Sequence, residues 1–353
     1  MNSVIIKEFS KLVSLIQEQL NDAYLDKNQS DINKHNFRLR QTKSILTKLR
    51  KYDIQITLEN VNDLLEIKGI GKGAVKRIHE ILSTGTLVEL EGLEKKDGSK
   101  KQVLKELQQV IGIGRSIAVD LLDKYKLKSV EDLISRNKKG EIPLNNKILL
   151  GLKYHNIYKM NIPRKEIEES YEFMNRVIKK MNRQLELDKN NKLKIQICGS
   201  FRRGKPLSND IDVLITKKGT LSKNKKEDAK YLNKFVHKLK KLRSQNNNKP
   251  FLIDDMTDKK STYKYMGFCK FKDNPPRRID IIFIPYESYP CALLYFTGSK
   301  ETSVIMRNKA KEQGWKLNEN ELYDKVNKKQ IKVKSEEEIF QKLEMEYLNP
   351  IDR

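Results

Sequence analysis

Asp210 and Asp212 stand two residues apart at the start of an apolar run that reads as a buried strand. Side chains alternate between the two faces of a strand, so both carboxylates share one face and repel each other. Divalent cations relieve such repulsion, because Mg²⁺ takes oxygen ligands from carboxylates and from substrate phosphates. Two ions about 3.5–4 Å apart can hold the attacking and leaving oxygens of an in-line phosphoryl displacement. The pattern therefore predicts metal-assisted chemistry on a phosphate ester.

The segment before this strand offers what a phosphate group needs. Residues 199–204 read Gly-Ser-Phe-Arg-Arg-Gly and follow a short apolar run at 193–197. Gly199 lets the backbone approach an anion closely, and Ser200 offers a hydroxyl. Arg202 or Arg203 adds charge-assisted hydrogen bonds. Taken alone, this segment is also typical of a surface loop, and the two aspartates alone are also typical of a solvated turn.

A third acidic residue favours the functional interpretation. Asp280 lies between isoleucines in a second strand-like segment, 275–285, where a period of two places it on one face with Arg278 and Ile282. A carboxylate in such a segment is costly unless a metal or a cation accompanies it. We therefore expect Asp280 to join the other two aspartates in one site.

Apolar spacing predicts the elements that hold these residues. Strands are expected at 193–197, from 210 to 216 and at 264–271, with a helix at 166–185 that packs behind the sheet. Near the start of the chain, apolar residues at helical spacing predict an amphipathic helix that contributes Ile5, Phe9, Leu12 and Ile16 to a core. Composition predicts loops at 217–230 and 243–249.

Residues 63–82 and 107–122 form an internal repeat. Each copy contains Gly-Ile-Gly between two apolar segments, at 69–71 and at 112–114. Such a turn exposes backbone N–H groups at the start of the second helix, where the helix dipole favours an anion. It can therefore bind a phosphodiester without reading the bases. One copy would indicate an ordinary helical hairpin, but two copies in a basic chain indicate sequence-independent DNA binding.

The composition also favours a polyanionic partner. The 353 residues include 72 Lys and Arg against 47 Asp and Glu, which gives a net charge of +25. Three cysteines without metal-ligand spacing favour a reducing compartment. The first ten residues lack the apolar core of a signal peptide, and no apolar run is long enough to span a bilayer. We expect an intracellular protein that associates with DNA, in a nucleus or an equivalent compartment, and not with membranes.

Together these motifs resemble those of the family X (polymerase beta-like) DNA polymerases. The resemblance rests on residues 199–204, on Arg-Arg-Ile-Asp at 277–280 and on Tyr-Phe-Thr-Gly-Ser at 295–299, which we read as a turn. It extends from about residue 30 to the end of the chain and implies an α+β fold. Helix-hairpin-helix domains would precede a nucleotidyltransferase palm with a mixed β-sheet and a small C-terminal lobe. The implied domains are 1–92 (lyase-like), 93–158 (second hairpin), 159–288 (palm) and 289–353 (nucleotide selection).

The resemblance implies a template-directed DNA polymerase that fills short gaps in DNA repair. It would act as a monomer on gapped or nicked double-stranded DNA and on dNTPs. Asp210 and Asp212 would bind two Mg²⁺ ions, which Mn²⁺ could replace, and Asp280 would bind the catalytic ion and activate the primer 3′-hydroxyl. The implied nucleotide contacts are Gly199, Ser200, Arg203, Ser208, Tyr295, Phe296, Gly298 and Ser303. The implied DNA contacts are Gly69, Gly71, Lys72, Gly112, Gly114, Lys264, Arg278 and Arg307. Backbone oxygens at the hairpins would hold Na⁺ or K⁺, namely those of Leu65, Ile67, Ile70, Gln108, Val110 and Ile113.

Three positions near the implied nucleotide site depart from the family pattern. Asn161 and Ile282 each stand where the family has an arginine, and Ser303 stands where it has an asparagine. None of these changes removes a metal ligand. They predict weaker nucleotide binding and looser base selection than in a typical member of the family.

A lyase activity is less well supported by the sequence. Arg77 stands where lyase domains of the family have the lysine that forms a Schiff base, and a guanidinium cannot act as that nucleophile. Lys72 or Lys76 could replace it, or both could simply bind phosphate. Two other functions stay open, which are untemplated nucleotide addition and non-catalytic binding of DNA ends.

Overall fold

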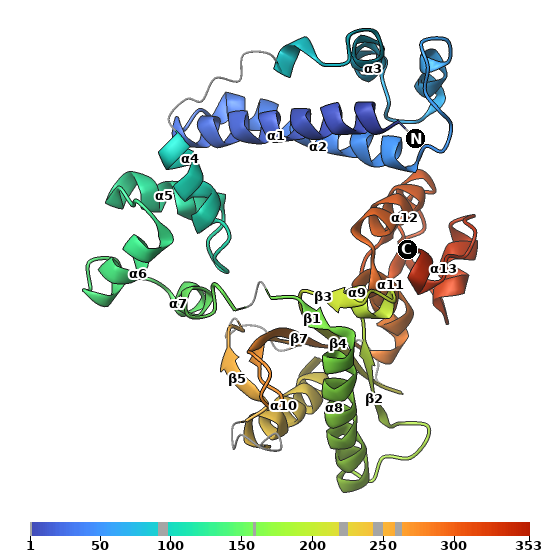
Figure 1. Ribbon diagram of the computed structural model, residues 1–353. Coiled ribbons are helices and arrows are strands. Elements are labelled where there is room, and N and C mark those ends of the chain that lie inside the picture. Colours follow the sequence, from blue (N-terminus) through green and yellow to red (C-terminus); the bar gives the residue numbers. More distant parts are fainter. Residues whose placement is uncertain (1, 91–97, 158–159, 219–224, 243–249, 258–262) are drawn as a thin grey trace. The chain divides into compact units, whose positions relative to one another are not determined.

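The chain folds into two compact units, Met1–Leu152 and Lys153–Arg353 (Figure 1). The computed structural model describes residues 2–90, 98–157, 160–218, 225–242, 250–257 and 263–353. The first unit is helical and the second contains a mixed sheet, which confirms the predicted α+β class. The finer division into four domains stays a prediction.

The helices of the first unit bury their apolar sides in two cores. Ile5, Phe9, Leu12 and Ile16 are all buried, as their spacing predicts. The second long helix begins at Asn28, whose side-chain oxygen accepts hydrogen bonds from N–H groups of the first turn. The elements of this unit are α1 (Ser3–Leu25), α2 (Gln29–Lys51), η1 (Val61–Glu66), α3 (Lys72–Thr84), η2 (Val88–Leu90), α4 (Gly98–Leu107), α5 (Arg115–Tyr125), α6 (Val130–Lys138) and α7 (Asn146–Lys153).

The second unit contains a large sheet, a small sheet and a two-stranded ribbon. Its helices are α8 (Arg164–Gln184), α9 (Gly199–Arg202), α10 (Lys225–Lys241), α11 (Tyr289–Thr297), α12 (Lys300–Glu312) and α13 (Glu336–Lys342), with the short η3 (Tyr286–Ser288) and η4 (Pro350–Asp352). Its strands are β1 (Ile162–Pro163), β2 (Leu193–Ile197), β3 (Leu207–Ser208), β4 (Ile211–Lys217), β5 (Leu252–Asp255), β6 (Lys264–Cys269), β7 (Arg277–Phe283), β8 (Trp315–Leu317), β9 (Leu322–Asp324) and β10 (Lys329–Ile331).

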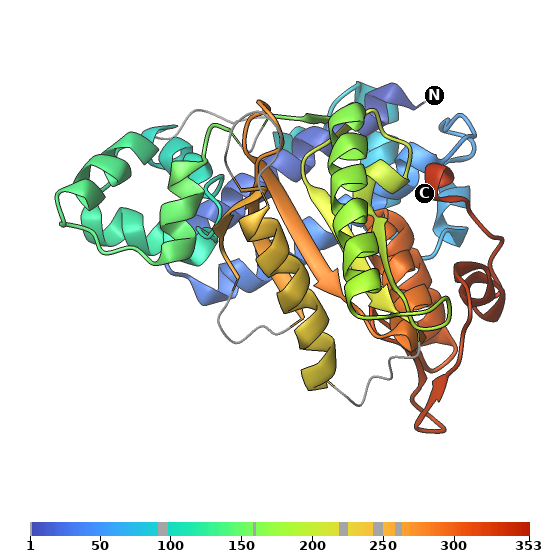
Figure 2. The ribbon, with the colours of Figure 1, turned by 90° about the horizontal axis from the view of Figure 1, so that it is seen from below.

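The large sheet has the strand order β2-β4-β7-β6-β5. Strands β4 and β7 are parallel, and the other neighbours are antiparallel. Helices α8 and α10 cover one face, where Ile178 and Phe235 meet Val213 and Ile281 in a buried core. Figure 2 shows both helices in front of the strands. Alternation sends every second side chain to the opposite face, which α11 covers only in part.

Two sequence-based predictions need correction. Residues 225–230 begin α10 instead of forming a loop, because the apolar stripe that continues at Leu232 and Phe235 packs on the sheet. Residues 219–224 of that predicted loop, and the whole of the other predicted loop, 243–249, lie outside the described residues. Residues 295–297 form the last turn of α11, so only Gly298 and Ser299 make the predicted turn before α12.

In the part of the chain that the structure describes, no helix combines the length and the apolar character that crossing a membrane requires. Cys198, Cys269 and Cys291 are free thiols, and all three are buried. Burial raises the pKa of the Cys291 thiol to about 12 and that of the other two further, so these cysteines stay protonated and pack as small apolar residues.

Candidate active site

The three aspartates come together at one end of strands β4 and β7. These strands are parallel neighbours, and their register pairs Asp212 directly with Asp280. Asp210 lies one residue before β4 begins, and not inside the strand as predicted. The residues that follow, such as Val213 and Ile281, are buried in the core under α8 and α10. Alternation therefore turns the carboxylates of Asp212 and Asp280 to the opposite face of the sheet.

The crowded carboxylates favour a cation. Burial raises the pKa of Asp212 to about 7, helped by the charges of Asp210 and Asp280. The guanidinium groups of Arg278 and Arg203 oppose this shift without cancelling it. Burial and the charge of Asp280 raise the pKa of Asp210 as well. Because a divalent cation stabilises the charged form of such groups and prefers carboxylate oxygens, this donor set suits Mg²⁺.

Asp280 is also held by a neighbouring arginine. The Nη2 atom of Arg278 donates to both carboxylate oxygens, at 2.8 and 2.9 Å, and its Nε donates at 3.1 Å. The two residues share a face of β7, as the period of two predicts. Because Arg278 occupies the carboxylate of Asp280, a bound ion would compete with this arginine. In keeping with this, no three Asp, Glu, His or Cys side chains among the described residues are already arranged as a metal cluster.

Gly199 lies directly against Asp212. Its φ is +58°, and a Cβ atom here would lie 2.2 Å from Oδ2 of Asp212. The amide of Cys198 donates to the Asp212 carbonyl at 2.8 Å, which keeps α9 beside β4. From α9, the Ser200 hydroxyl donates to the buried Ser208 hydroxyl at 2.8 Å. Only glycine leaves room for a serine-bearing helix this close to the aspartates.

Arg203 links the segment 199–204 with the segment 295–299, two of the motifs on which the family resemblance rests. Its Nη1 donates to the carbonyl of Thr297 at 2.5 Å. A Cβ atom on Gly298, whose φ is +71°, would lie 3.1 Å from the same nitrogen. Segments that are 94 residues apart in the chain therefore meet, and the unused N–H groups of Arg203 remain available for an anion.

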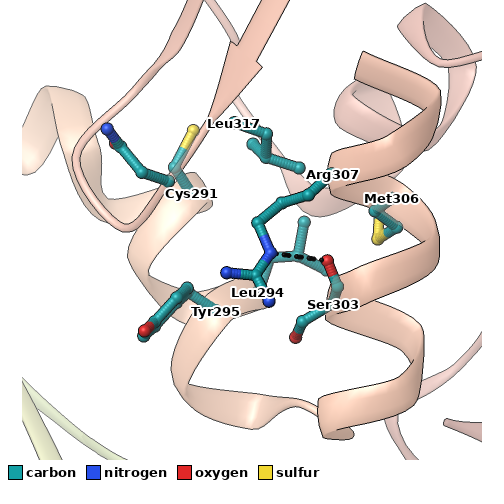
Figure 3. Close-up of a pocket in the computed structure, with 8 residues that line it drawn as sticks. Cys291, Leu294, Tyr295, Ser303, Met306, Arg307 and Leu317 are labelled. Carbon is teal, nitrogen blue, oxygen red and sulfur yellow. Dashed lines mark hydrogen bonds between the residues drawn. The ribbon is translucent and has the colours of Figure 1, made fainter. Parts of the chain in front are cut away.

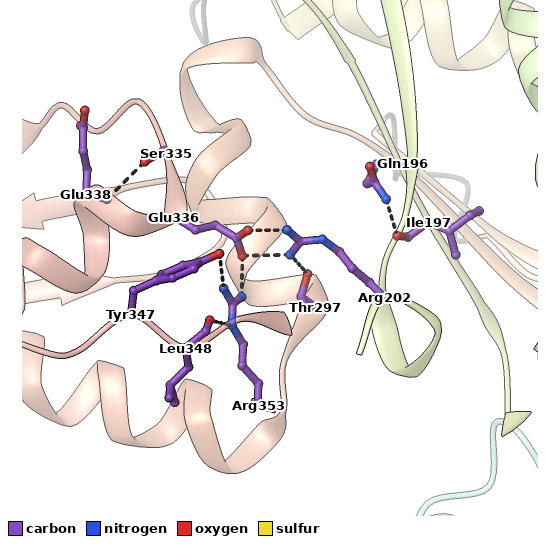
Figure 4. Close-up of polar contacts among 10 residues, drawn as sticks. All are labelled: Gln196, Ile197, Arg202, Thr297, Ser335, Glu336, Glu338, Tyr347, Leu348 and Arg353. Atoms are coloured by element: carbon purple, nitrogen blue, oxygen red, sulfur yellow. Dashed lines mark hydrogen bonds and ion pairs between the residues drawn. The ribbon is translucent and has the colours of Figure 1, made fainter. Parts of the chain in front are cut away.

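Arg202 has a structural role that the sequence did not indicate. It donates to the Thr297 hydroxyl at 2.6 Å and to both oxygens of Glu336 on α13, at 3.0 and 2.5 Å (Figure 4). Arg353 donates to Glu336 at 2.5 Å and to the carbonyl of Leu348 at 2.9 Å. The Glu336 side chain is 5% exposed and that of Arg353 is 0% exposed. Arg202 is therefore committed to this buried cluster and not to a phosphate.

Helices α11 and α12 present the next group of predicted residues. Ser303 and Arg307 from α12 border a small pocket together with Tyr295 and Cys291 from α11 (Figure 3). The Ser303 hydroxyl donates to the Ser299 carbonyl at 2.8 Å, and Arg307 Nε donates to the Ser303 carbonyl at 3.1 Å. Both side chains therefore lie along their own helix, and most of the Arg307 guanidinium remains exposed.

A cavity of about 740 Å³ opens beside Asp280. Its lining includes Lys264 and Ile282 from the sheet and Tyr295 and Phe296 from α11. The rings of Tyr295 and Phe296 lie 5.2 Å apart in an edge-to-face arrangement. The C-terminal lobe adds lining residues that sequence reasoning missed, namely Glu319, Asn320, Glu321 and Gln330. The volume is in the range of small-molecule sites.

The two Gly-Ile-Gly segments form matching turns in the first unit. Gly69 and Gly112 have φ values of +87° and +93°. Helix α3 then begins after Gly71, and α5 begins after Gly114. In each turn the second residue donates a backbone hydrogen bond three residues back, to Ile67 at 2.9 Å and to Val110 at 3.0 Å. The backbone repeat is thus confirmed, and cation binding by its carbonyl groups stays a prediction.

The structure places Arg77 in an ion-pair cluster. Its guanidinium donates to both oxygens of Glu89, and Arg38 pairs with the same carboxylate at 3.3 Å. Lys72 and Lys76, the predicted substitutes, are exposed on α3. No motif pointed to Glu89, because the contact depends on how η2 folds back on α3.

Comparison with known proteins gives concordant matches. Residues 161–286 match the family model for the DNA polymerase beta palm, and residues 292–353 match the model for the DNA polymerase beta thumb. DNA polymerase lambda of Rattus norvegicus is 30% identical over 311 residues, which are 84% of this chain and 49% of that protein. DNA polymerase lambda of Arabidopsis thaliana is 28% identical over 84% of this chain and 54% of its own length. DNA nucleotidylexotransferase of Xenopus laevis is 26% identical over 78% and 56%. The chain thus spans about half the length of these relatives.

Proposed function

Because the chain belongs to the family X DNA polymerases, we propose that it is a template-directed DNA polymerase that fills short gaps during DNA repair. The observation that carries the proposal is the pairing of Asp212 with Asp280 across β4 and β7, beside the short helix that Gly199 begins. The substrates would be a dNTP and the primer 3′-hydroxyl of gapped or nicked DNA. The net charge of +25 and the paired hairpins support a DNA partner.

In this proposal the aspartates hold two divalent ions. Asp210 and Asp212 would bind both, and Asp280 would release Arg278 to bind the catalytic one. The bound ions, Mg²⁺ or Mn²⁺, supply charge neutralisation of the triphosphate and favour loss of the proton from the primer hydroxyl. The released Arg278 remains near the carboxylates, where it can donate to a phosphate of the primer strand.

Other side chains would position the nucleotide. The Ser200 hydroxyl and the unused N–H groups of Arg203 can donate to the β and γ phosphates. There they would stabilise the negative charge that develops on the leaving pyrophosphate. Tyr295 and Phe296 line the cavity beside Asp280 and would form the floor under the sugar. Catalysis would rest on positioning and electrostatics, as for phosphoryl transfer in general.

Filling of a one-nucleotide gap tests this function. Wild type should add the templated dNTP in the presence of Mg²⁺ and should discriminate against NTPs. Asp212→Ala should abolish the addition, and Glu172→Ala, which removes an exposed carboxylate on α8, should leave it unchanged. Tight binding of the gapped DNA by wild type without any extension would instead indicate a protein that only binds DNA ends.

Untemplated addition is the second candidate, because one relative is named a DNA nucleotidylexotransferase. A single-stranded primer without template separates the two functions. Extension of this primer at a rate similar to that on the gap would favour the second candidate.

The ion pair of Arg77 with Glu89 argues against a lyase activity that uses this position. Neither a guanidinium nor a carboxylate can act as the amine that forms the Schiff base. Borohydride trapping on a 5′-deoxyribose-phosphate end, repeated with Lys72→Ala and Lys76→Ala, tests the remaining lysines. Loss of a trapped adduct in either variant would identify the nucleophile.

A further inference from the structure

The C-terminal parts of α8 and α10 are basic and contain no acidic residue. Residues 176–184 include four Lys and Arg, residues 230–242 include five, and neither segment includes Asp or Glu. Both helices cover the face of the large sheet that lies opposite the carboxylates of Asp212 and Asp280 (Figure 2). The mechanism proposed above uses none of these basic residues, so their charge is available to a second partner.

A groove of about 500 Å³ lies between the two helices. Its apolar lining consists of Phe173, Val177 and Leu242. Val177 is buried, Phe173 is partly buried against the core, and Leu242 is 39% exposed. Single exposed leucines are common on protein surfaces, but one that borders an apolar pocket surrounded by polar groups is typical of an interaction site.

The same groove is also lined by basic side chains from both helices. They are Arg176, Lys180, His237, Lys238 and Lys241. Within the part of the chain that the structure describes, no ion pair engages Arg176, Lys180 or Lys241. Glu172, one turn before Arg176 on α8, is exposed and does not line the groove. The groove therefore keeps a positive charge that the carboxylates of a partner can neutralise.

Contacts near the ends of both helices hold the groove in shape. At the end of α8, the side-chain oxygen of Gln184 accepts a hydrogen bond of 2.8 Å from Nζ of Lys238. At the end of α10, the carbonyl of Leu242 accepts a hydrogen bond of 3.1 Å from the amide of Phe251. The ring of Phe251 lies 5.2 Å from that of Phe173. A partner would thus meet a groove that is already formed, which lowers the entropy cost of binding.

We propose that this groove is the docking site for an acidic peptide segment of a partner protein. The segment places an apolar side chain between Phe173 and Leu242, while its carboxylates pair with Arg176, Lys180 and Lys241. A nucleic acid fits less well, because its phosphates would use the cations and leave the apolar lining without a partner. Since the groove and the aspartates lie on opposite faces of the sheet, the peptide and a primer end would not compete. The inference goes beyond the proposed function.

A copolymer of glutamate and tyrosine provides the probe, because it combines carboxylates with aromatic rings. Polyglutamate of the same length is the comparison. Fluorescence anisotropy measures the binding of each labelled polymer to the full chain at physiological ionic strength, with gapped DNA in excess so that the DNA-binding surfaces are occupied. We expect wild type to bind the copolymer more tightly than polyglutamate.

Two changes separate the charged and apolar parts of the groove. Lys180→Glu together with Lys241→Glu should weaken binding of the copolymer about tenfold, since each reversal replaces an attraction by a repulsion. Leu242→Ala should weaken binding of the copolymer at least about fourfold, the effect of losing one buried CH₂ group, and should leave binding of polyglutamate unchanged.

Lys179→Glu together with Lys234→Glu is the matched control, because both residues are exposed on the same helices and do not line the groove. This control should change binding of the copolymer less than about twofold. An equal loss in the two double variants, or equal binding of the two polymers by wild type, would indicate a general attraction to the basic chain and would overturn the inference. It would also be overturned if the Lys180 and Lys241 reversals weakened binding of gapped DNA, since the surface would then bind nucleic acid.

Discussion

The buried cluster around Glu336 provides the sharpest test of how the second unit is held together. Glu336 accepts three charge-assisted hydrogen bonds, two from Arg202 and one from Arg353, and it is nearly inaccessible to water. In Glu336→Gln the shape of the side chain is kept, but the two guanidinium groups lose the negative charge that compensates their burial. Breaking a buried pair in this way costs about 3–5 kcal/mol. Because glutamine still offers one acceptor oxygen, we expect a loss near the lower end of that range, about 3 kcal/mol.

Urea denaturation followed by the fluorescence of Trp315, the single tryptophan, measures this loss in the unit that contains the cluster. With a slope of about 2 kcal/mol per molar urea, the midpoint should fall by about 1.5 M. Glu344→Gln, which changes an exposed carboxylate in the same lobe, should move the free energy of unfolding by less than about 0.5 kcal/mol.

A triple variant distinguishes buried charge from lost packing. Replacing Arg202, Glu336 and Arg353 together by methionine removes all three charges while keeping most of the volume, so it should recover at least half of the stability that Glu336→Gln loses. The reasoning would be refuted if Glu336→Gln unfolded at the wild-type urea concentration. It would also fail if the triple variant were as unstable as the single one, since desolvated charge would then not be the cause.

Four further outcomes are expected. Gly199→Ala should lower the rate of nucleotide addition at least about a hundredfold, because its Cβ would lie 2.2 Å from Asp212 at a positive φ. Gly73→Ala, in a helix with only Arg77 Nη1 within 4 Å at 3.7 Å, should instead raise the thermal midpoint slightly, since alanine favours the helix by about 0.5–1 kcal/mol. Asp280→Ala should abolish primer extension in single-turnover assays while the dissociation constant for gapped DNA changes less than about threefold, because the proposed mechanism has Asp280 bind the catalytic ion and gives it no contact with DNA; a parallel loss of DNA binding would contradict this proposed role. Ser303→Asn should lower the misinsertion frequency in a steady-state assay. The serine hydroxyl is bound to the Ser299 carbonyl of its own helix, whereas the longer asparagine amide can reach beyond the helix. An unchanged frequency would mean that Ser303 does not limit base selection.

The sequence by itself determined the local features of this protein. The spacing of two residues predicted which faces of the strands Asp212, Arg278 and Asp280 occupy, because alternation is a property of any extended chain. The two Gly-Ile-Gly turns could also be predicted from the sequence, since a positive φ at Gly69 and Gly112 depends on only a few neighbouring atoms. The apolar spacing of α1 and α8 likewise predicted helices and the sides that they bury.

Only the tertiary structure decided which distant groups meet. Arg202 and Glu336 are 134 residues apart, and nothing in either segment indicates the other. Lys48 reaches the first hairpin from another helix, and Glu89 takes the guanidinium of Arg77. Such contacts depend on how whole elements pack and on the loops that join them, so a local pattern cannot specify them. The sequence therefore predicted a cation-binding role for the carboxylates. The packing of the elements determined which arginines and lysines are engaged in contacts with carboxylates and carbonyl groups, and which keep N–H donors for an anion.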